Sequence, residues 1–344
     1  MRFLFHSIAV VLFFVAIGCL SCFAASHYQV LNKYVLGGDG GWDYLTLEPK
    51  SHRLFIARSD RVMVVDSEKG TSIAEIPKTQ GIHGIALALD EGRGFTSNGR
   101  QNTVTTFDLA NLKVLHETSV GTRPDAILYD DFSKRVFTFN GGSNDATAVR
   151  VDGEQVAGTV ALGGRPEFGV TDGQGKIYVN LEDKSELVEF DPKTLKVNNH
   201  WKLAPCEEPT GLALDREHHR LFVGCGNKMM VVVNGDNGKV ITTLPIGEGV
   251  DATRFDPETR LAFASCGRDA VLTIIHQDSP DKYSVVQNVS TERGARTMDL
   301  DLATHKIYLV TAKFGAAPAP TSDNPRPRPS IEPGSFELLV VGPK

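Results

Sequence analysis

Short apolar runs separated by polar turns recur along most of this chain. The clearest copy is the segment 207–248, where four runs of about five residues alternate with stretches rich in Gly, Asn, Asp and charge. The runs are 210–214, 220–224, 229–233 and 239–244. Runs of this length are typical of β-strands, and none of them has helical periodicity. The segment therefore predicts a four-stranded antiparallel unit.

The same unit recurs at intervals of 40 to 45 residues. An aromatic residue marks the second run of each unit, at Phe55, Phe95, Phe137, Tyr178, Phe222, Phe263 and Tyr308. A polar residue marks the end of the third run, at Asp66, Asp108, Asp152, Asp191, Asn234 and His276. Four-stranded units with this period predict an all-β fold, a seven-bladed β-propeller.

The two ends of the repeat array complete each other. The last unit lacks a fourth run, because the chain stops shortly after the apolar run 336–341, whereas the run 28–36 precedes the first full unit. We therefore expect the N-terminal strand to close the last blade, which removes an open sheet edge. The expected blades are 42–81, 82–122, 123–164, 165–206, 207–248, 249–292 and 293–342 with 28–36.

Residues 1–25 differ from the repeats. Arg2 is followed by the apolar run 8–20 and then by small residues up to Ala25. These are the n-, h- and c-regions of a signal peptide. The prediction is an exported protein, periplasmic or extracellular, whose residues 26–344 form one propeller domain. A lipoprotein, modified at Cys19 or Cys22, is the alternative.

Composition limits the partners that we expect. The chain is 41% hydrophobic and 23% charged, an ordinary globular balance, and its net charge of −6 does not favour nucleic acid. No apolar run after the leader is long enough to span a bilayer, so we expect no transmembrane segment in the mature chain. The mature protein is expected to be a monomer.

The second runs carry degenerate forms of one short motif, at FTSN 95–98, FTFN 137–140, YVN 178–180 and YLVT 308–311. With the turns DPKTLKV 191–197 and NGDNGKV 234–240, they resemble the YVTN-family (YncE-like) bacterial seven-bladed propellers. The resemblance covers nearly all of the mature chain, although blades one, three and seven depart most. It implies the fold and no particular function, because the motif residues are structural.

The links between blades share one face of a propeller with the loops between second and third strands. The candidate ligand-binding residues in these links are Trp42, His83, Arg123, Asp125, Arg165, Glu167, Glu207, Arg293 and Arg296. The second-to-third-strand loops add Arg58, Arg61, Arg100 and Arg268. Arginine suits bidentate contacts to carboxylate or phosphate, so this face can bind a small anionic ligand. The alternative is ion pairing between these arginines and nearby acids, such as Asp43 and Asp251.

His83 is the candidate for a general base or a metal ligand, but no second ligand stands at a recognisable spacing. A hydrogen-bonded loop histidine is the alternative. The sequence contains no nucleophile elbow, phosphate loop, HExxH or CxxCH motif. We therefore assign no catalytic residue and expect no metal and no cofactor.

Three cysteines lie beyond the leader: Cys206, Cys225 and Cys266. Cys225 and Cys266 hold equivalent positions in adjacent blades, which are too far apart for a disulfide. Cys206 is the better partner for Cys225 in an exported protein. Free buried thiols and a soft-metal site remain as alternatives.

The Pro-rich segment 315–335 interrupts blade seven between its second and third strands, as a flexible insertion, a lid or a partner-binding arm. Taken together, the sequence predicts an exported, non-catalytic propeller that binds a small anionic ligand or an envelope protein. The alternative is a lactonase- or lyase-type enzyme with its site at the channel mouth. His83 or a channel carboxylate would act there, with arginines stabilising an oxyanion.

Overall fold

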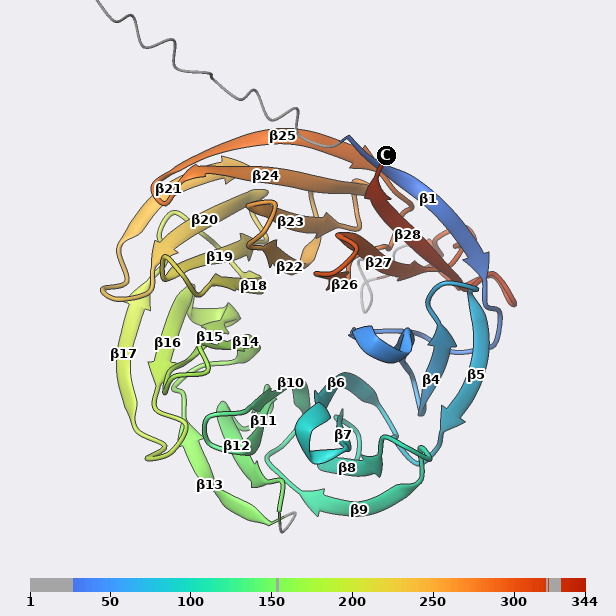
Figure 1. Cartoon of the computed structure of the whole chain (residues 1–344), viewed down its shortest axis with the longest axis horizontal. Helices are drawn as coiled ribbons and strands as arrows, with labels where there is room; N and C mark the ends of the chain where they lie inside the picture. Colours follow the sequence, from blue (N-terminus) through green and yellow to red (C-terminus); the bar gives the residue numbers. More distant parts are fainter. Residues whose placement is uncertain (1–26, 153–154, 320, 322–328) are drawn as a thin grey trace, which may run out of the picture.

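We describe a computed structural model of the chain, in which residues 27–152, 155–319, 321 and 329–344 are placed. Seven four-stranded antiparallel sheets surround a central axis as a seven-bladed β-propeller (Figure 1). The fold predicted from the repeat is confirmed. Three short 3-10 turns accompany the strands, η1 (Pro49–Ser51), η2 (Leu89–Glu91) and η3 (Glu182–Lys184).

In the first six blades the strands follow the chain order from the axis outward (Figure 1). The innermost strands are β2 (Leu45–Glu48), β6 (Ile82–Ala88), β10 (Pro124–Asp130), β14 (Pro166–Thr171), β18 (Pro209–Asp215), β22 (Val250–Asp256) and β26 (Met298–Asp301). The second strands are β3 (Arg53–Arg58), β7 (Arg93–Asn98), β11 (Arg135–Asn140), β15 (Ile177–Leu181), β19 (Arg220–Cys225), β23 (Leu261–Cys266) and β27 (Lys306–Thr311).

The outer strands complete each sheet. The third strands are β4 (Arg61–Asp66), β8 (Thr103–Asp108), β12 (Asp145–Arg150), β16 (Glu186–Phe190), β20 (Met229–Asn234), β24 (Val271–Ser279) and β28 (Glu337–Pro343). The fourth strands are β5 (Thr71–Ile76), β9 (Val114–Ser119), β13 (Val156–Ala161), β17 (Val197–Lys202), β21 (Val240–Pro245), β25 (Lys282–Ser290) and, for blade seven, β1 (Tyr28–Val35).

The two ends of the described chain close the ring in blade seven. Strand β1 pairs antiparallel with β28 on the outside of the sheet, from Tyr28 opposite Pro343 to Val35 opposite Glu337 (Figure 1). At the inner end, the backbone N–H of Leu47 in blade one donates to Asp299 Oδ2 of blade seven at 2.8 Å. The predicted closure by the N-terminal strand is confirmed, and the array has no open edge at this seam.

The repeat markers have structural roles. Phe55 and the equivalent phenylalanines of blades two, three, five and six are fully buried in their sheets. The marker carboxylates cap the turn after the third strand, since Asp66 Oδ1 accepts the backbone N–H groups of Glu68 and Lys69 at 3.0 Å. These residues therefore identify the fold but carry no information about a ligand.

Two predicted segments are only partly covered by the structure. The leader, with Cys19 and Cys22, lies outside the described residues. The Pro-rich segment lies between β27 and β28, and its described ends meet in an antiparallel bridge between Phe314 and Ile331. Among the placed residues, no helix has the length and apolar character needed to cross a bilayer.

Candidate functional site

Each blade contributes one residue from an equivalent position at the start of its first strand or just before it. Leu45 of blade one pairs with Ile56 near the middle of the second strand, and Ile85 of blade two pairs with Thr96 in the same way. The position in question lies two residues before Leu45, Ile85 and their equivalents in the other blades. In blades two to six the pairing shifts register at this point. We call the set the channel ring: Asp43, His83, Asp125, Glu167, Thr210, Asp251 and Arg296.

The channel ring, apart from Thr210, lines a cavity of about 1060 Å³ on the face of the between-blade links. Tyr44 and Phe168, each next to a ring residue in sequence, line a second cavity of about 200 Å³ further along the axis. Their rings pack with centroids 5.1 Å apart, so side chains from blades one and four meet at the smaller cavity. We call the larger space the channel cavity.

A chain of charged contacts joins five blades within the ring. His83 Nδ1 lies 2.6 Å from Asp43 Oδ2 and 3.6 Å from Asp125 Oδ1. The other oxygen of Asp43 lies 3.3 Å from Arg296 Nη2, and Arg296 Nε lies 2.6 Å from Asp251 Oδ2. Three carboxylates thus alternate with two cations around the wall of the cavity.

The pKa values in the ring reflect this crowding. Burial lowers the pKa of His83, but the hydrogen bond to Asp43 and the charge of Asp125 outweigh it and raise the pKa to about 9. Burial raises the pKa of Asp125 to about 7; His83 opposes this shift, whereas the charges of Asp43 and Asp251 reinforce it. Burial also raises the pKa of Asp251. His83 is therefore protonated at neutral pH, and Asp125 is poised near neutrality.

Glu167 of the ring and the neighbouring Tyr44 lack hydrogen-bond partners among the described residues. The Glu167 side chain makes no hydrogen bond or ion pair with the placed residues, and burial together with the charges of Asp125 and Asp251 holds its pKa well above the usual range. Tyr44 is 4% exposed, and its hydroxyl has no hydrogen-bond partner within the described part of the chain. The charges that act on its phenol are Asp251, Glu167, Asp125 and Asp43.

Three arginines at the mouth of the cavity are free of ion pairs. Arg100, Arg123 and Arg293 line the cavity and are exposed, and none of them forms a side-chain ion pair with any placed residue. We call them the rim arginines. They come from blades two, three and seven. Arg123 also adopts a left-handed backbone angle, φ 53°, at a position where blades two and six have glycine.

The nine residues predicted as candidates divide into two groups. Seven of them line the channel cavity: Trp42, His83, Arg123, Asp125, Glu167, Arg293 and Arg296. The other two do not line it: Arg165 is exposed and pairs with Glu182 at 2.7 Å, and Glu207 is exposed beside the blade-five link.

Ion pairing explains part of the arginine set, as the alternative interpretation expected. Arg296 is held by Asp43 and Asp251, and Arg268 lies 3.0 Å from Glu248. Arg58 does not face the cavity, because its side chain is fully buried and stacks on the Phe336 ring at 3.6 Å. Among the arginines that line the cavity, the rim arginines are the ones that form no ion pair with a placed residue, so all their side-chain donors are available to an anion.

Sequence reasoning placed Asp43 and Asp251 on this face only as pairing partners and overlooked Tyr44. The signal that finds them is the aligned start of each first strand: WDYL, IHGI, PDAI, PEFG, PTGL, VDAT and ARTM. The second residue of each tetrapeptide is the channel-ring residue. This signal is one residue per repeat, so it becomes visible only after the strand register is known.

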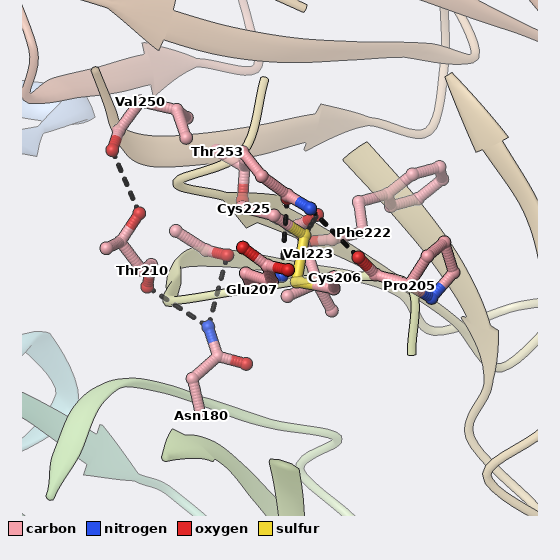
Figure 2. Close-up of a disulfide and its surroundings, with 12 residues drawn as sticks. Asn180, Pro205, Cys206, Glu207, Thr210, Phe222, Val223, Cys225, Val250 and Thr253 are labelled. Carbon is pink, nitrogen blue, oxygen red and sulfur yellow. Dashed lines mark hydrogen bonds between the residues drawn. A yellow bond between two sulfur atoms is a disulfide. The ribbon is translucent and has the colours of Figure 1, made fainter. Parts of the chain in front are cut away.

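The predicted disulfide is present between Cys206 and Cys225 (Figure 2). Cys266 is a buried free thiol. The bond ties the link that enters blade five to the end of β19. Nearby, Asn180 Nδ2 of blade four donates to the carbonyl of Thr210 at 3.1 Å, and Thr210 Oγ1 donates to Val250 O of blade six at 2.9 Å (Figure 2). Thr210 thus uses its ring position to join blades rather than to face the cavity.

The ring can hold a metal ion in one place. Asp43, His83 and Asp125 each offer a ligand atom, and these three atoms lie within 4.8 Å of one another. Sequence spacing gave His83 no second ligand, because its two neighbours stand about 40 residues away in adjacent blades. The same three residues can also act as a proton-transfer group, since a carboxyl with a pKa near 7 suits general acid–base chemistry.

Comparison with known proteins supports the fold and identifies no family. No family model matches the chain, and no curated protein matches it. Among solved structures, the chain is similar to Kuenenia stuttgartiensis hydrazine synthase, with a TM-score of 0.71 and 14% identity over 82% of this chain and 95% of that one. At this identity the likeness shows the shared seven-bladed architecture, which is compatible with a scaffold or an enzyme.

Proposed function

We propose that this protein binds a small polar ligand with an anionic group in the channel cavity. The observation that carries the proposal is the set of three unpaired rim arginines at the mouth of a cavity of about 1060 Å³. Small-molecule sites are concave pockets of comparable size with a few convergent polar groups. Arginines without internal partners in such a place have donors available for a carboxylate or phosphate.

The remaining walls fit the rest of such a ligand. Trp42 lines the cavity and packs against Phe314 and Phe336, with ring centroids 5.9 and 5.6 Å away, which gives one apolar side. The carboxylates of the channel ring offer acceptors for hydroxyl or amino groups. A sugar acid, a lactone-derived acid or an amino-acid-like molecule combines an anionic group with such donors. We take these and phosphates as the substrate classes to test.

The experiment is a thermal-shift panel of sugar acids, lactones and phosphates, run on wild type, Arg123→Ala and Arg216→Ala. Arg216 is exposed in the turn after β18, on the opposite face, so its substitution makes the same change of charge away from the cavity. A ligand that binds the folded state raises the Tm. We expect a shift in wild type and Arg216→Ala that is lost or weakened in Arg123→Ala.

A second candidate function is catalysis of the lactonase or lyase type. The contact between His83 and Asp43, with Asp125 poised near neutrality on the other side, favours it as an acid–base group. Turnover of a panel lactone that disappears in Asp125→Asn while the fold is retained would support it. Binding without turnover would leave the protein as a binding protein.

We further propose that the protein is exported and is a distant relative of the YVTN-family propellers. The leader-like residues 1–25 and the Cys206–Cys225 disulfide support export, because disulfides persist in oxidising compartments. We keep an envelope protein as the alternative partner to a small anionic ligand. Immunoblotting of periplasmic and cytoplasmic fractions tests the location, and a cytoplasmic protein that keeps residues 1–25 would contradict it.

A further inference from the structure

Three ligand atoms of different chemistry converge on one point of the channel wall. They are a carboxylate oxygen of Asp43, the Nδ1 atom of His83 and a carboxylate oxygen of Asp125, all within 4.8 Å of one another. Neighbouring ligands of an octahedral ion with bonds of about 2.1 Å lie about 3 Å apart. The separations of 2.6 and 3.6 Å around His83 Nδ1 bracket that value. We propose that Asp43, His83 and Asp125 bind one divalent metal ion.

The charge balance of the channel ring favours an added cation. Four carboxylates, those of Asp43, Asp125, Glu167 and Asp251, line the channel cavity, whereas Arg296 is the one arginine of the ring. With all four carboxylates ionised and His83 bound to the ion as a neutral ligand, the charges of the ring sum to −3, from four carboxylates and one guanidinium. A divalent ion reduces that excess to −1, so its binding relieves repulsion between the carboxylates.

Two side chains close to the proposed ligands lack hydrogen-bond partners within the described part of the chain. The Tyr44 hydroxyl is buried and unpartnered, and the charges that act on it are four ring carboxylates. Glu167 beside it is likewise unpartnered among the placed residues. Glu167 lines the channel cavity with the three proposed ligands, whereas Tyr44 lines the smaller cavity. A water molecule bound to the ion would supply the donor that the Glu167 carboxylate lacks.

The ligands are held in place from behind, as metal ligands usually are. The second oxygen of Asp43 contacts Arg296, and the backbone carbonyl of Asp43 accepts a hydrogen bond from Thr297 Oγ1 at 2.9 Å. The backbone carbonyl of Asp125 accepts a hydrogen bond from Ser97 Oγ. These contacts hold the Asp43 carboxylate and the backbone of both aspartates without using the oxygens that face His83.

The ligand set selects among metals. A single imidazole with carboxylates suits Mn²⁺ better than Ca²⁺, which prefers oxygen ligands alone. Zn²⁺ also takes such ligands, but it favours four-coordinate sites, whereas the additional carboxylates and the space of the cavity leave room for six. We therefore take Mn²⁺ as the probe, with Zn²⁺ and Ca²⁺ as competitors. This site does not depend on the rim arginines or on the proposed anionic ligand.

The test is Mn²⁺ binding to chelator-treated protein by calorimetry and electron paramagnetic resonance. We expect one Mn²⁺ per chain, a raised Tm and, in the paramagnetic resonance spectrum, ¹⁴N coupling from one imidazole. All three are measured on wild type and require no variant. His83→Gln and Asp125→Asn should lower the affinity at least about 10-fold, the effect usual for disturbing a metal site. Glu207→Gln, which removes an exposed carboxylate outside the cavity, should bind as wild type does.

Three results would overturn the proposed metal site. Wild type that binds none of the three ions at millimolar concentration overturns the proposal, as does bound Mn²⁺ without ¹⁴N coupling. Equal affinity in wild type and His83→Gln overturns it too. Because the spectroscopic measurement uses wild type, a variant that fails to fold does not remove the test. Metal binding that is unchanged in Arg123→Ala would show that the metal site and the anion site are separate.

Discussion

The aromatic ring of Tyr44 in blade one packs against that of Phe168 in blade four, with centroids 5.1 Å apart. Tyr44 therefore leaves its own sheet and joins the buried cluster of blades three and four, which contains Ala126 and Phe137. Both side chains line the smaller of the two cavities. The contact also places a hydroxyl without a partner among the ring carboxylates.

Tyr44→Phe should leave the metal-free protein as stable as wild type or make it more stable. The reason is that the substitution removes a buried donor that makes no hydrogen bond within the described structure. Tyr178→Phe is the matched comparison, because the Tyr178 hydroxyl donates to Gly235 O at 3.0 Å, and it should lower the free energy of unfolding by about 1 kcal/mol. Urea unfolding of both variants measures this, and equal losses would show that the Tyr44 hydroxyl is satisfied.

The protonation of His83 should make stability pH-dependent in the metal-free protein. Folding raises its pKa from 6.5 to about 9, so its contribution is complete below pH 6.5 and is lost as the pH rises through 9. The side chain is 37% exposed, and after allowance for solvent screening the loss should be about 1 to 2 kcal/mol. Urea unfolding from pH 6 to 10 should show it in wild type and not in His83→Gln. Parallel curves would contradict the assignment.

The disulfide gives a direct chemical prediction. In the cleaved protein, denatured without reductant, a thiol reagent should label Cys266 alone, and after reduction it should label three cysteines. Cys206→Ser with Cys225→Ser should lower the free energy of unfolding by about 3 kcal/mol, because the bond closes a loop with a sequence separation of 19 residues. Labelling of all three without reduction would mean that the bond does not form in the cell.

The glycine that ends the NGDNG turn should be intolerant of a side chain. Gly238 has φ 72°, and a Cβ there would lie 2.1 Å from the ring of Trp201. Gly238→Ala should therefore cost about 2 kcal/mol or more, from backbone strain and steric overlap together. Gly92 has φ 63° with open space around it. Gly92→Ala should therefore lower the free energy of unfolding by the backbone strain alone, about 1 kcal/mol. Thermal unfolding of the two variants separates the contributions, and equal costs would contradict this account.

The sequence predicted the fold well because its markers repeat for physical reasons. An aromatic residue such as Phe55 fills the same buried position in each sheet, and a residue such as Asp66 caps the same turn. Each requirement recurs once per blade, so the period is visible in a single chain. The disulfide followed from the same register, since Cys206 in a link and Cys225 at a strand end share one face.

The site was predicted only in outline. The sequence located the links and their arginines, but it did not show that Arg296 is neutralised by Asp43 and Asp251 while Arg123 is left free. Contacts between adjacent blades join residues about 40 positions apart, or 253 positions apart where Asp43 of blade one meets Arg296 of blade seven. Their pairing depends on the register shift at the start of each first strand. A composition pattern contains no information on which of two nearby charges a side chain reaches.

The central claim is that the rim arginines bind an anionic ligand in the channel cavity. The most direct measurement is the thermal-shift panel on wild type and on the triple variant Arg100→Ala, Arg123→Ala, Arg293→Ala, with Arg216→Ala as the charge control. The account predicts that at least one sugar acid or phosphate raises the Tm of wild type and of the control but not of the triple variant. A blank panel for wild type, or a shift that the triple variant retains, would contradict it.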